Sequence, residues 1–339
     1  MLGKKNFAIF TIGLIVSGCG GPAKVDLLTV WPPPPAEPII TYEESIYGSH
    51  DLPRSFIGKI ADFLFGRSTD YDIVKPYGLT YDGRSKIYIA DTAKKGVIIL
   101  DTGSGKAKLL TSIEPYGHLG EPVNIVLDSD KNVYVADTRL GKIVVFDKEL
   151  KFTHFIGAEG ELVNPVGMAI NAKDDKIYVV DTNVHMVKIF NLEGKFLGEF
   201  GRRGDQKGEF HYPLGIAIND GDTIFVVDSF HFAVQAFDME GNYLFSFGSD
   251  SAGIGHMARP RCIAIDSGGN IYVTDALNHD VQIYTNRGKL IMKIGGFGFG
   301  PGKFRLPAGI HISEDNDIFV SDSINKRIQK FRYLKKSDL

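Results

Sequence analysis

The sequence predicts an all-β protein built as a ring of six blades, and three observations lead to this prediction. A five-residue motif, from IYIAD ending at Asp91 to IFVSD ending at Asp322, occurs six times at spacings of 44 to 47 residues. Short segments rich in Ile, Val, Tyr and Phe give about four strands per repeat. The chain also contains 39 glycines and 15 prolines, as a turn-rich fold requires. One four-stranded unit cannot bury both of its faces, so repeats of this length indicate a six-bladed β-propeller.

Residues 1–18 have the pattern of a secretory signal and not of a folded element. Two lysines precede an apolar run of about ten residues, which is too short to span a bilayer. The sequence VSGC at residues 16–19 closely resembles the lipobox of bacterial lipoproteins. This resemblance implies that Cys19 is acylated, that the lipid bilayer is a partner and that the protein lies in the bacterial envelope. Gly20 in place of aspartate favours the outer membrane over the inner one.

Residues 19–38 are predicted to be the lipidated cysteine and a proline-rich tether. Trp31 is followed by four consecutive prolines, which favour an extended polyproline II spacer. Residues 39–75 are predicted to hold two elements. Residues 39–48 have the form of a fourth strand and would complete blade six, which otherwise stops after three strands. Residues 55–66 have apolar side chains at helical spacing and are expected to form a short amphipathic helix before blade one.

Residues 76–334 are predicted to form the six blades. Each blade begins with a proline-led strand, for example PAGIHIS at 307–313, continues with the aspartate motif and adds a third strand. The pattern over residues 76–332 resembles the NHL repeat, and blade six matches it most fully through DSINKRIQ at 322–329. The resemblance implies the fold but says little about function, because this propeller carries many unrelated activities.

The six copies act as internal replicates that separate architecture from function. The aspartate ending the second strand recurs in every copy, so we assign it to the turn that follows and not to a metal site. The glycine-rich segments beginning at Gly201, Gly248 and Gly295 lack a P-loop ending, and we interpret them as connectors between blades. Cys262, the single thiol of the predicted propeller, lies in an apolar run and is expected to be a small buried residue.

Positions where one blade departs from its siblings are the candidates for function. Asn124 and Cys262 replace a glycine of the first strand, and Arg261 stands where the other blades have Tyr, Val, Val, Leu and Ala. Blade four has aromatic residues in a turn that is elsewhere polar. Arginine and aromatic side chains dominate binding energetics at interfaces. The predicted binding residues are therefore Arg259, Arg261, Phe230, His231, Phe232, Asn124 and Tyr212.

The rim that carries these residues is predicted to be basic. It collects most of the Lys and Arg residues that lie near the motif turns, whereas the opposite rim collects turn acids. Such a face would attract an anionic partner even though the chain has a formal charge of −3. The leading hypothesis is a non-enzymatic, membrane-anchored scaffold for a protein, peptide or envelope polysaccharide, with no cofactor. The charge and the lipobox disfavour a nucleic-acid partner.

The alternative is a metal-dependent enzyme of the lyase or lactonase type, which the propeller resemblance also allows. Related six-bladed enzymes hold zinc or calcium in the axial channel. Zinc needs about three imidazoles directed at one point, and His185, His279 and His311 are not expected to converge. The residues considered for a calcium site are Asn124, Glu121 and Asn164. Two cysteines in the whole chain exclude both a disulfide scaffold and a thiolate zinc cage.

Overall fold

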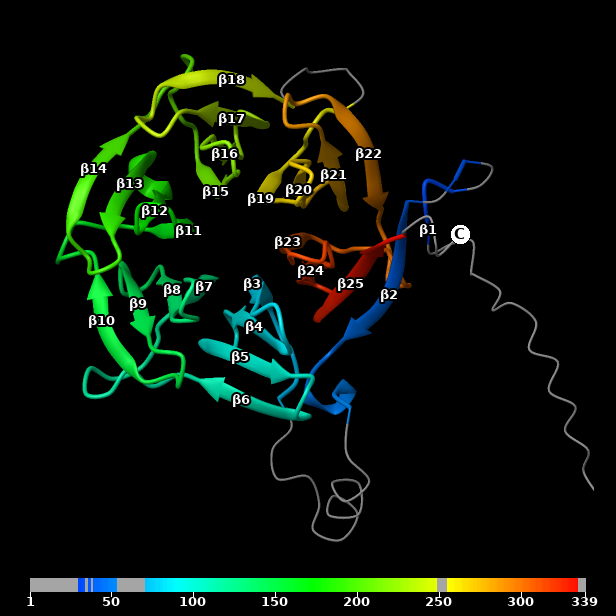
Figure 1. Ribbon diagram of the computed structural model, residues 1–339, viewed down its shortest axis with the longest axis horizontal. Coiled ribbons are helices and arrows are strands. Elements are labelled where there is room, and N and C mark those ends of the chain that lie inside the picture. Colours follow the sequence, from blue (N-terminus) through cyan, green and yellow to red (C-terminus); the bar gives the residue numbers. More distant parts are fainter. Residues whose placement is uncertain (1–29, 34–35, 38, 54–70, 249–254, 335–339) are drawn as a thin grey trace, which may run out of the picture.

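Six antiparallel sheets form a ring around a central axis in the computed structural model (Figure 1). The structure describes residues 30–33, 36–37, 39–53, 71–248 and 255–334. The predicted signal, Cys19 and the predicted helix at 55–66 lie outside the described residues. The described helical segments are single 3-10 turns, η2 (Ser49–Asp51) and η3 (Thr182–Val184). None of the described helical segments is long and apolar enough to cross a membrane.

Blades one to five each run from an inner strand beside the axis to an outer strand in sequence order, whereas blade six takes its outer strand from the N-terminal side of the chain. Blade one contains β3 (Pro76–Tyr81), β4 (Lys86–Asp91), β5 (Gly96–Asp101) and β6 (Lys106–Leu110). Blade two contains β7 (Pro122–Leu127), β8 (Val133–Asp137), β9 (Lys142–Phe146) and β10 (Phe152–Ile156). Blade three contains β11 (Pro165–Asn171), β12 (Lys176–Asp181), β13 (Met186–Asn191) and β14 (Phe196–Phe200).

The second half of the ring repeats this arrangement, and the predicted six-bladed propeller is confirmed. Blade four contains β15 (Pro213–Ile218), β16 (Ile224–Asp228), β17 (Ala233–Phe237) and β18 (Tyr243–Phe247). Blade five contains β19 (Pro260–Ile265), β20 (Ile271–Asp275), β21 (Asp280–Tyr284) and β22 (Leu290–Gly295). Blade six contains β23 (Pro307–Ile312), β24 (Ile318–Asp322) and β25 (Arg327–Tyr333), joined by strands from the N-terminal side of the chain.

The closing strand comes from the segment that the sequence placed there. Strand β2 (Ile40–Ile46) pairs antiparallel with β25, so blade six has its outer strand (Figure 1). A further strand, β1 (Val30–Trp31), pairs with β2. The structure thus corrects part of the tether prediction for residues 19–38. Val30 is buried, and the ring of Trp31 packs on that of Phe331 with 5.6 Å between the centroids. These two apolar side chains are removed from water at the edge of blade six, whereas a free spacer would leave them exposed.

The core lies between blades, and strand alternation explains how it forms. Ile87 and Ile89 of β4 face blade six, where they pack in a cluster with Phe319. Tyr88 and Ala90 face the other way and join the cluster with blade two. Successive side chains of a strand point to opposite faces, so the motif I-Y-I-A fills two interfaces at once. Both faces of each blade are therefore buried only when the ring is complete.

The recurring aspartates have a structural role, as predicted, and each carboxylate binds backbone N–H groups beyond the turn that follows it. All six are fully buried. The carboxylate of Asp91 accepts hydrogen bonds from the turn that follows it, through the N–H groups of Ala93 and Lys94. It also accepts from the N–H groups of Val74 and Lys75, which precede the inner strand. One carboxylate thus fixes the entry to the first strand and the exit from the second.

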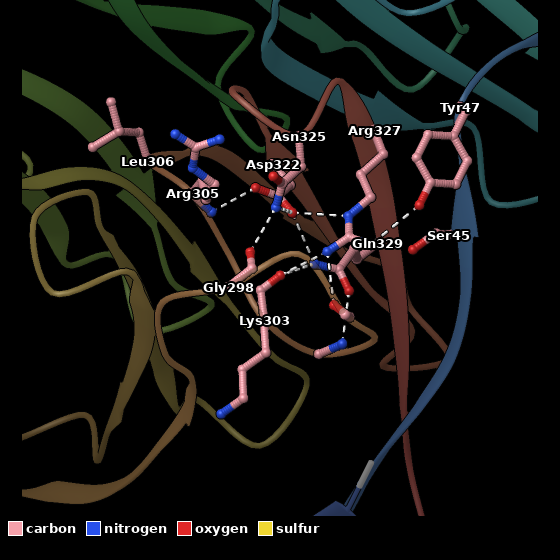
Figure 2. A network of polar contacts seen from close by, with 12 residues as sticks. Ser45, Tyr47, Gly298, Lys303, Arg305, Leu306, Asp322, Asn325, Arg327 and Gln329 are labelled. Atoms are coloured by element: carbon pink, nitrogen blue, oxygen red, sulfur yellow. Dashed lines mark hydrogen bonds and ion pairs between the residues drawn. The ribbon is translucent and has the colours of Figure 1, made fainter. Parts of the chain in front are cut away.

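Blade six extends this arrangement into a buried ion pair (Figure 2). The Nε of Arg327 lies 2.9 Å from Oδ2 of Asp322, and both side chains are almost fully buried. The same guanidinium donates to the carbonyls of Gly300 and Lys303 and to the hydroxyl of Tyr47. Arg327 therefore connects the blade, its connector and the N-terminal closing segment.

Candidate functional site

A pocket of about 400 Å³ opens at the centre of the ring, on the rim where the inner strands begin. Residues from all six blades line it. Its charged side chains are Lys75, Glu121, Arg259 and Arg261, and its aromatic ones are Tyr77 and Tyr212. Two threonines, Thr92 and Thr138, and the amide of Asn164 add polar groups. We call this feature the axial pocket.

At the floor of the axial pocket the inner strands of neighbouring blades lie in close contact. A Cβ built on Gly309 would lie 2.3 Å from the carbonyl oxygen of Tyr77, and one on Gly78 would lie 2.6 Å from that of Val123. Asn124 and Cys262 hold the equivalent positions in two blades and line a small cavity below the pocket. The Asn124 side chain accepts from the N–H of Ile125. Cys262 is half-buried and not fully buried as expected, because it lines this small cavity, and desolvation raises the pKa of its thiol.

Arg259 and Arg261 are placed by the start of β19. The N–H of Arg259 donates to the buried carboxylate of Asp275, which holds the chain at the rim. The Arg259 guanidinium lies over the ring of Phe230 at 5.0 Å, and that of Arg261 lies over Tyr77 at 5.8 Å. Both arginines are half-buried. Within the described residues, neither has a carboxylate within ion-pair distance.

The structure separates the three consecutive candidates of blade four. Phe230 packs on Tyr212 at 5.1 Å and supports Arg259, so it borders the axial pocket. His231 instead donates from its Nδ1 to the buried Asp228 at 2.7 Å and lines a separate cavity with Asp205. Phe232 lies beside His256, with 6.2 Å between the two ring centroids. The pocket therefore gathers Arg259, Arg261 and Tyr212, with Phe230 beside them and Asn124 below. His231 and Phe232 do not belong to it.

His185 and His279, which occupy equivalent turns, have equivalent structural roles. The Nδ1 of His185 accepts from the N–H of Tyr212, and the Nδ1 of His279 accepts from the N–H of Leu306. Each pair has the same separation of 3.1 Å. These histidines thus orient the residue before the next inner strand. His311 lies apart from both, on the inner strand β23 near Thr80, and burial lowers its pKa to about 4.

Two features of the site were missed by sequence reasoning. Tyr77 stands in blade one at the position that Arg261 holds in blade five, so the same comparison of blades contained the signal. Asp205 was not considered as a partner of His211 and His231, yet the ligand-type atoms of all three lie within 4.8 Å of one another. A connector loop brings Asp205 and His211 to the turn of blade four. No spacing rule in the repeat indicated that approach.

The fold and the axial pocket define the class of protein, a six-bladed β-propeller with a polar central mouth. The family described as "6-bladed beta-propeller" (DUF5128) matches residues 164–250 and 259–335. No curated protein matches the sequence at a significant level.

Solved structures resemble this chain in fold, at low identity. A Bacteroides thetaiotaomicron protein of unknown function is 16% identical with a TM-score of 0.61, covering 77% of this chain and 70% of that chain. An auxiliary nutrient binding protein from the same organism is 15% identical with a TM-score of 0.60, covering 79% and 74%. A catalytically inactive virginiamycin B lyase from Staphylococcus aureus, with quinupristin, is 15% identical with a TM-score of 0.58, covering 80% and 86%. These likenesses show the fold alone.

Proposed function

We propose that this propeller is a non-enzymatic binding module that takes a carboxylate-bearing ligand, from an acidic polysaccharide, peptide or protein, in the axial pocket. The proposal rests on the partial burial of Arg259 and Arg261 and on their lack of an ion-pair partner in the part of the chain that the structure describes. Both are half-buried without an ion-pair partner among the described residues, whereas Arg327 is fully paired within the blade. A partly desolvated guanidinium gains most from an anion that binds it through two hydrogen bonds.

The shape and the remaining lining of the pocket fit the same ligand class. A volume of about 400 Å³ suits one sugar ring or one side chain with its terminal group. The rings of Tyr77 and Tyr212 offer apolar surface, while Thr92 and Thr138 offer hydroxyls. Lys75 adds a third positive charge at the mouth and Glu121 a single negative one. The field inside the pocket therefore favours an anion.

The experiment measures binding to the full-length chain in detergent by calorimetry. The probes are an oligogalacturonate and a glutamate-rich peptide. We expect Arg261→Ala to weaken binding by about 10- to 100-fold, since hydrogen bonds to charged groups contribute about 1.5–3 kcal/mol. Arg287→Ala, which removes the same charge from a turn of the opposite rim, is the matched control. Equal affinities for the wild type and Arg261→Ala would contradict the proposal.

We propose, in addition, that the module is anchored in the bacterial envelope through acylated Cys19, with the outer membrane favoured by Gly20. The support is the lipobox-like sequence at residues 16–19. Metabolic labelling with an alkyne palmitate analogue tests this directly. Label is expected on the wild-type chain and not on Cys19→Ser, and equal labelling of both would contradict the anchor.

The alternative function, a metal-dependent lyase or lactonase, is supported by one observation. Glu121 and Asn164, two of the residues considered for calcium, line the same pocket. Three positive side chains share the pocket with them, and their charge opposes that of a divalent cation. Calorimetry with Ca²⁺ distinguishes the two functions. Binding that disappears in Glu121→Gln would favour the enzyme, whereas no such binding would favour the module.

A further inference from the structure

We propose that Asp205, His211 and His231 form a transition-metal site, of the kind that takes Zn²⁺, at the edge of blade four and outside the axial pocket. One carboxylate oxygen and two imidazole nitrogens, all within 4.8 Å of one another, make up the set. Two imidazoles and one carboxylate are a ligand set that zinc uses in proteins when a fourth position stays open to water. Asp205 is 87% exposed, so the fourth position faces solvent.

The orientation of His231 is the second and independent observation. Its Nδ1 donates to Oδ2 of Asp228 at 2.7 Å, and Asp228 is fully buried. This bond places a proton on Nδ1 and leaves Nε2 to face Asp205. Nε2 donates to Oδ1 of Asp205 at 3.2 Å, and an ion bound between the two atoms would replace that proton. Metal-binding histidines commonly donate their other N–H to a carboxylate in this way, which fixes the ring and raises its basicity.

His211 is held in place from several sides. Its backbone N–H donates to both carboxylate oxygens of Asp228. Its ring lies 5.7 Å from that of His231 and 5.4 Å from that of Phe230. One buried carboxylate thus positions both histidines. His185, whose ring is 6.3 Å from that of His211, is excluded from the ligand set because its Nδ1 already accepts from Tyr212.

Blades five and six have asparagine at the turn position that His231 occupies in blade four. Asn278 and Asn325 occupy the position of His231, three residues after the aspartate, and donate from Nδ2 to that aspartate. Each also donates to a backbone carbonyl of its connector. In blade four the second partner is instead the side chain of Asp205. Histidine is thus not needed for the turn, because asparagine makes the same bond to the buried carboxylate.

The surroundings leave room for an ion and a bound water. A cavity of about 220 Å³ lies beside His231 and Asp205. Lys207 also lines this cavity, but its ammonium lies over the ring of Tyr243 at 5.9 Å. An ion here would connect the segment between β14 and β15 to the turn between β16 and β17. Its direct effect would be to hold the residues that lead into the axial pocket at Tyr212.

The test titrates chelator-stripped full-length chain with Zn²⁺ by calorimetry and records the visible absorption of the Co²⁺ form. We expect one ion per chain. His231→Asn is the decisive variant, because the repeat itself shows that asparagine keeps the turn, and we expect it to bind Zn²⁺ at least about 100-fold more weakly. Asp205→Asn should weaken binding as well. Without metal, both variants should unfold at the temperature of the wild type.

His50→Asn is the matched control. It removes another histidine that lies between two carboxylates, Asp51 at 3.4 Å and Asp72 at 3.3 Å. Unchanged affinity in His50→Asn together with loss in His231→Asn would support the site. Equal binding by His231→Asn, or a wild-type chain that takes no Zn²⁺ at micromolar concentrations, would overturn it. Glu121→Gln separates this site from any cation bound in the axial pocket, since it should leave the Zn²⁺ affinity unchanged.

Discussion

The guanidinium of Arg259 lies over the ring of Phe230, with 5.0 Å between the guanidinium carbon and the ring centroid. The two residues come from neighbouring blades, and the contact keeps the arginine at the mouth of the axial pocket. A cation over an aromatic face is stabilised by about 0.5–1 kcal/mol when partly exposed. The turn of blade four thus acts on the pocket without lining it.

Phe230→Leu tests this relationship. The change keeps an apolar side chain but removes the aromatic face, so Arg259 loses its preferred position. We expect affinity for an acidic probe to fall by about 2- to 5-fold in calorimetry, less than for Arg261→Ala. Phe232→Leu is the control, because Phe232 is similarly exposed, at 40% against 36%, and contacts His256 instead. An equal loss in both variants would contradict a specific role for Phe230.

Arg327→Met should destabilise the ring strongly. The substitution removes one partner of the buried pair with Asp322 and leaves a buried carboxylate with less compensation. Breaking such a pair costs about 3–5 kcal/mol. Urea unfolding should therefore show that the free energy of unfolding falls by about 3 kcal/mol, the lower end of this range. The loss is not larger because Asn325 and Gln329 still donate to Asp322. A loss below about 1 kcal/mol would contradict the importance of this contact.

Asp280→Asn should stabilise the protein at neutral pH. Burial raises the pKa of Asp280 to about 6 from 3.8, while nearby Lys293 opposes the shift. A folded pKa above the unfolded value means that the fold favours the protonated acid. That contribution is present below about pH 4 and is lost as the pH rises through about 6. At pH 7 the variant should gain about 1–3 kcal/mol.

The same variant supplies its own control through pH. Near pH 3, below both the unfolded pKa of 3.8 and the folded one, the wild-type acid is largely protonated in both states, so Asp280→Asn should match the wild type in urea unfolding. A gain that is the same at both pH values would show that the effect is not one of charge. Lys293 is 37% exposed, so water can solvate its ammonium after the substitution.

His311→Gln should reduce the acid sensitivity of the protein. Burial, and to a smaller extent the charge of Lys131, lowers the pKa of His311 to about 4 from 6.5. A folded pKa below the unfolded one means that the unfolded chain binds the extra proton. Wild-type stability should therefore fall as the pH drops from about 6.5 towards 4. The variant should show a shallower fall in thermal unfolding over that interval, and an unchanged slope would contradict this account.

The fold was largely predictable because it is repetitive. Six aspartate motifs gave the blades, and the fourth-strand form of residues 39–48 gave the closing strand that pairs with β25. Strand β1 was not predicted, because a two-residue pairing in a proline-rich segment has no periodic signal. The prolines that suggested a free spacer begin directly after Trp31.

The site was predictable only where it lies on the repeat. Comparison of equivalent positions found Arg261 and Asn124, since the register of an inner strand fixes which residues face the axis. It could not separate Phe230, His231 and Phe232, because three successive residues of a tight turn point in different directions. The approach of Asp205 to His231 depends on a connector, and loop conformation is not set by hydrophobic periodicity.

The most direct test of the account compares charged and neutral forms of the same probe on the wild-type chain. Calorimetry would use an oligogalacturonate and its methyl ester, and a glutamate-rich peptide and its glutamine counterpart. The account predicts that, in at least one pair, the acid binds at least about 10-fold more tightly, and that 0.5 M salt weakens the difference. Equal affinities within both pairs, or no binding by either acid, would contradict an anion-binding axial pocket.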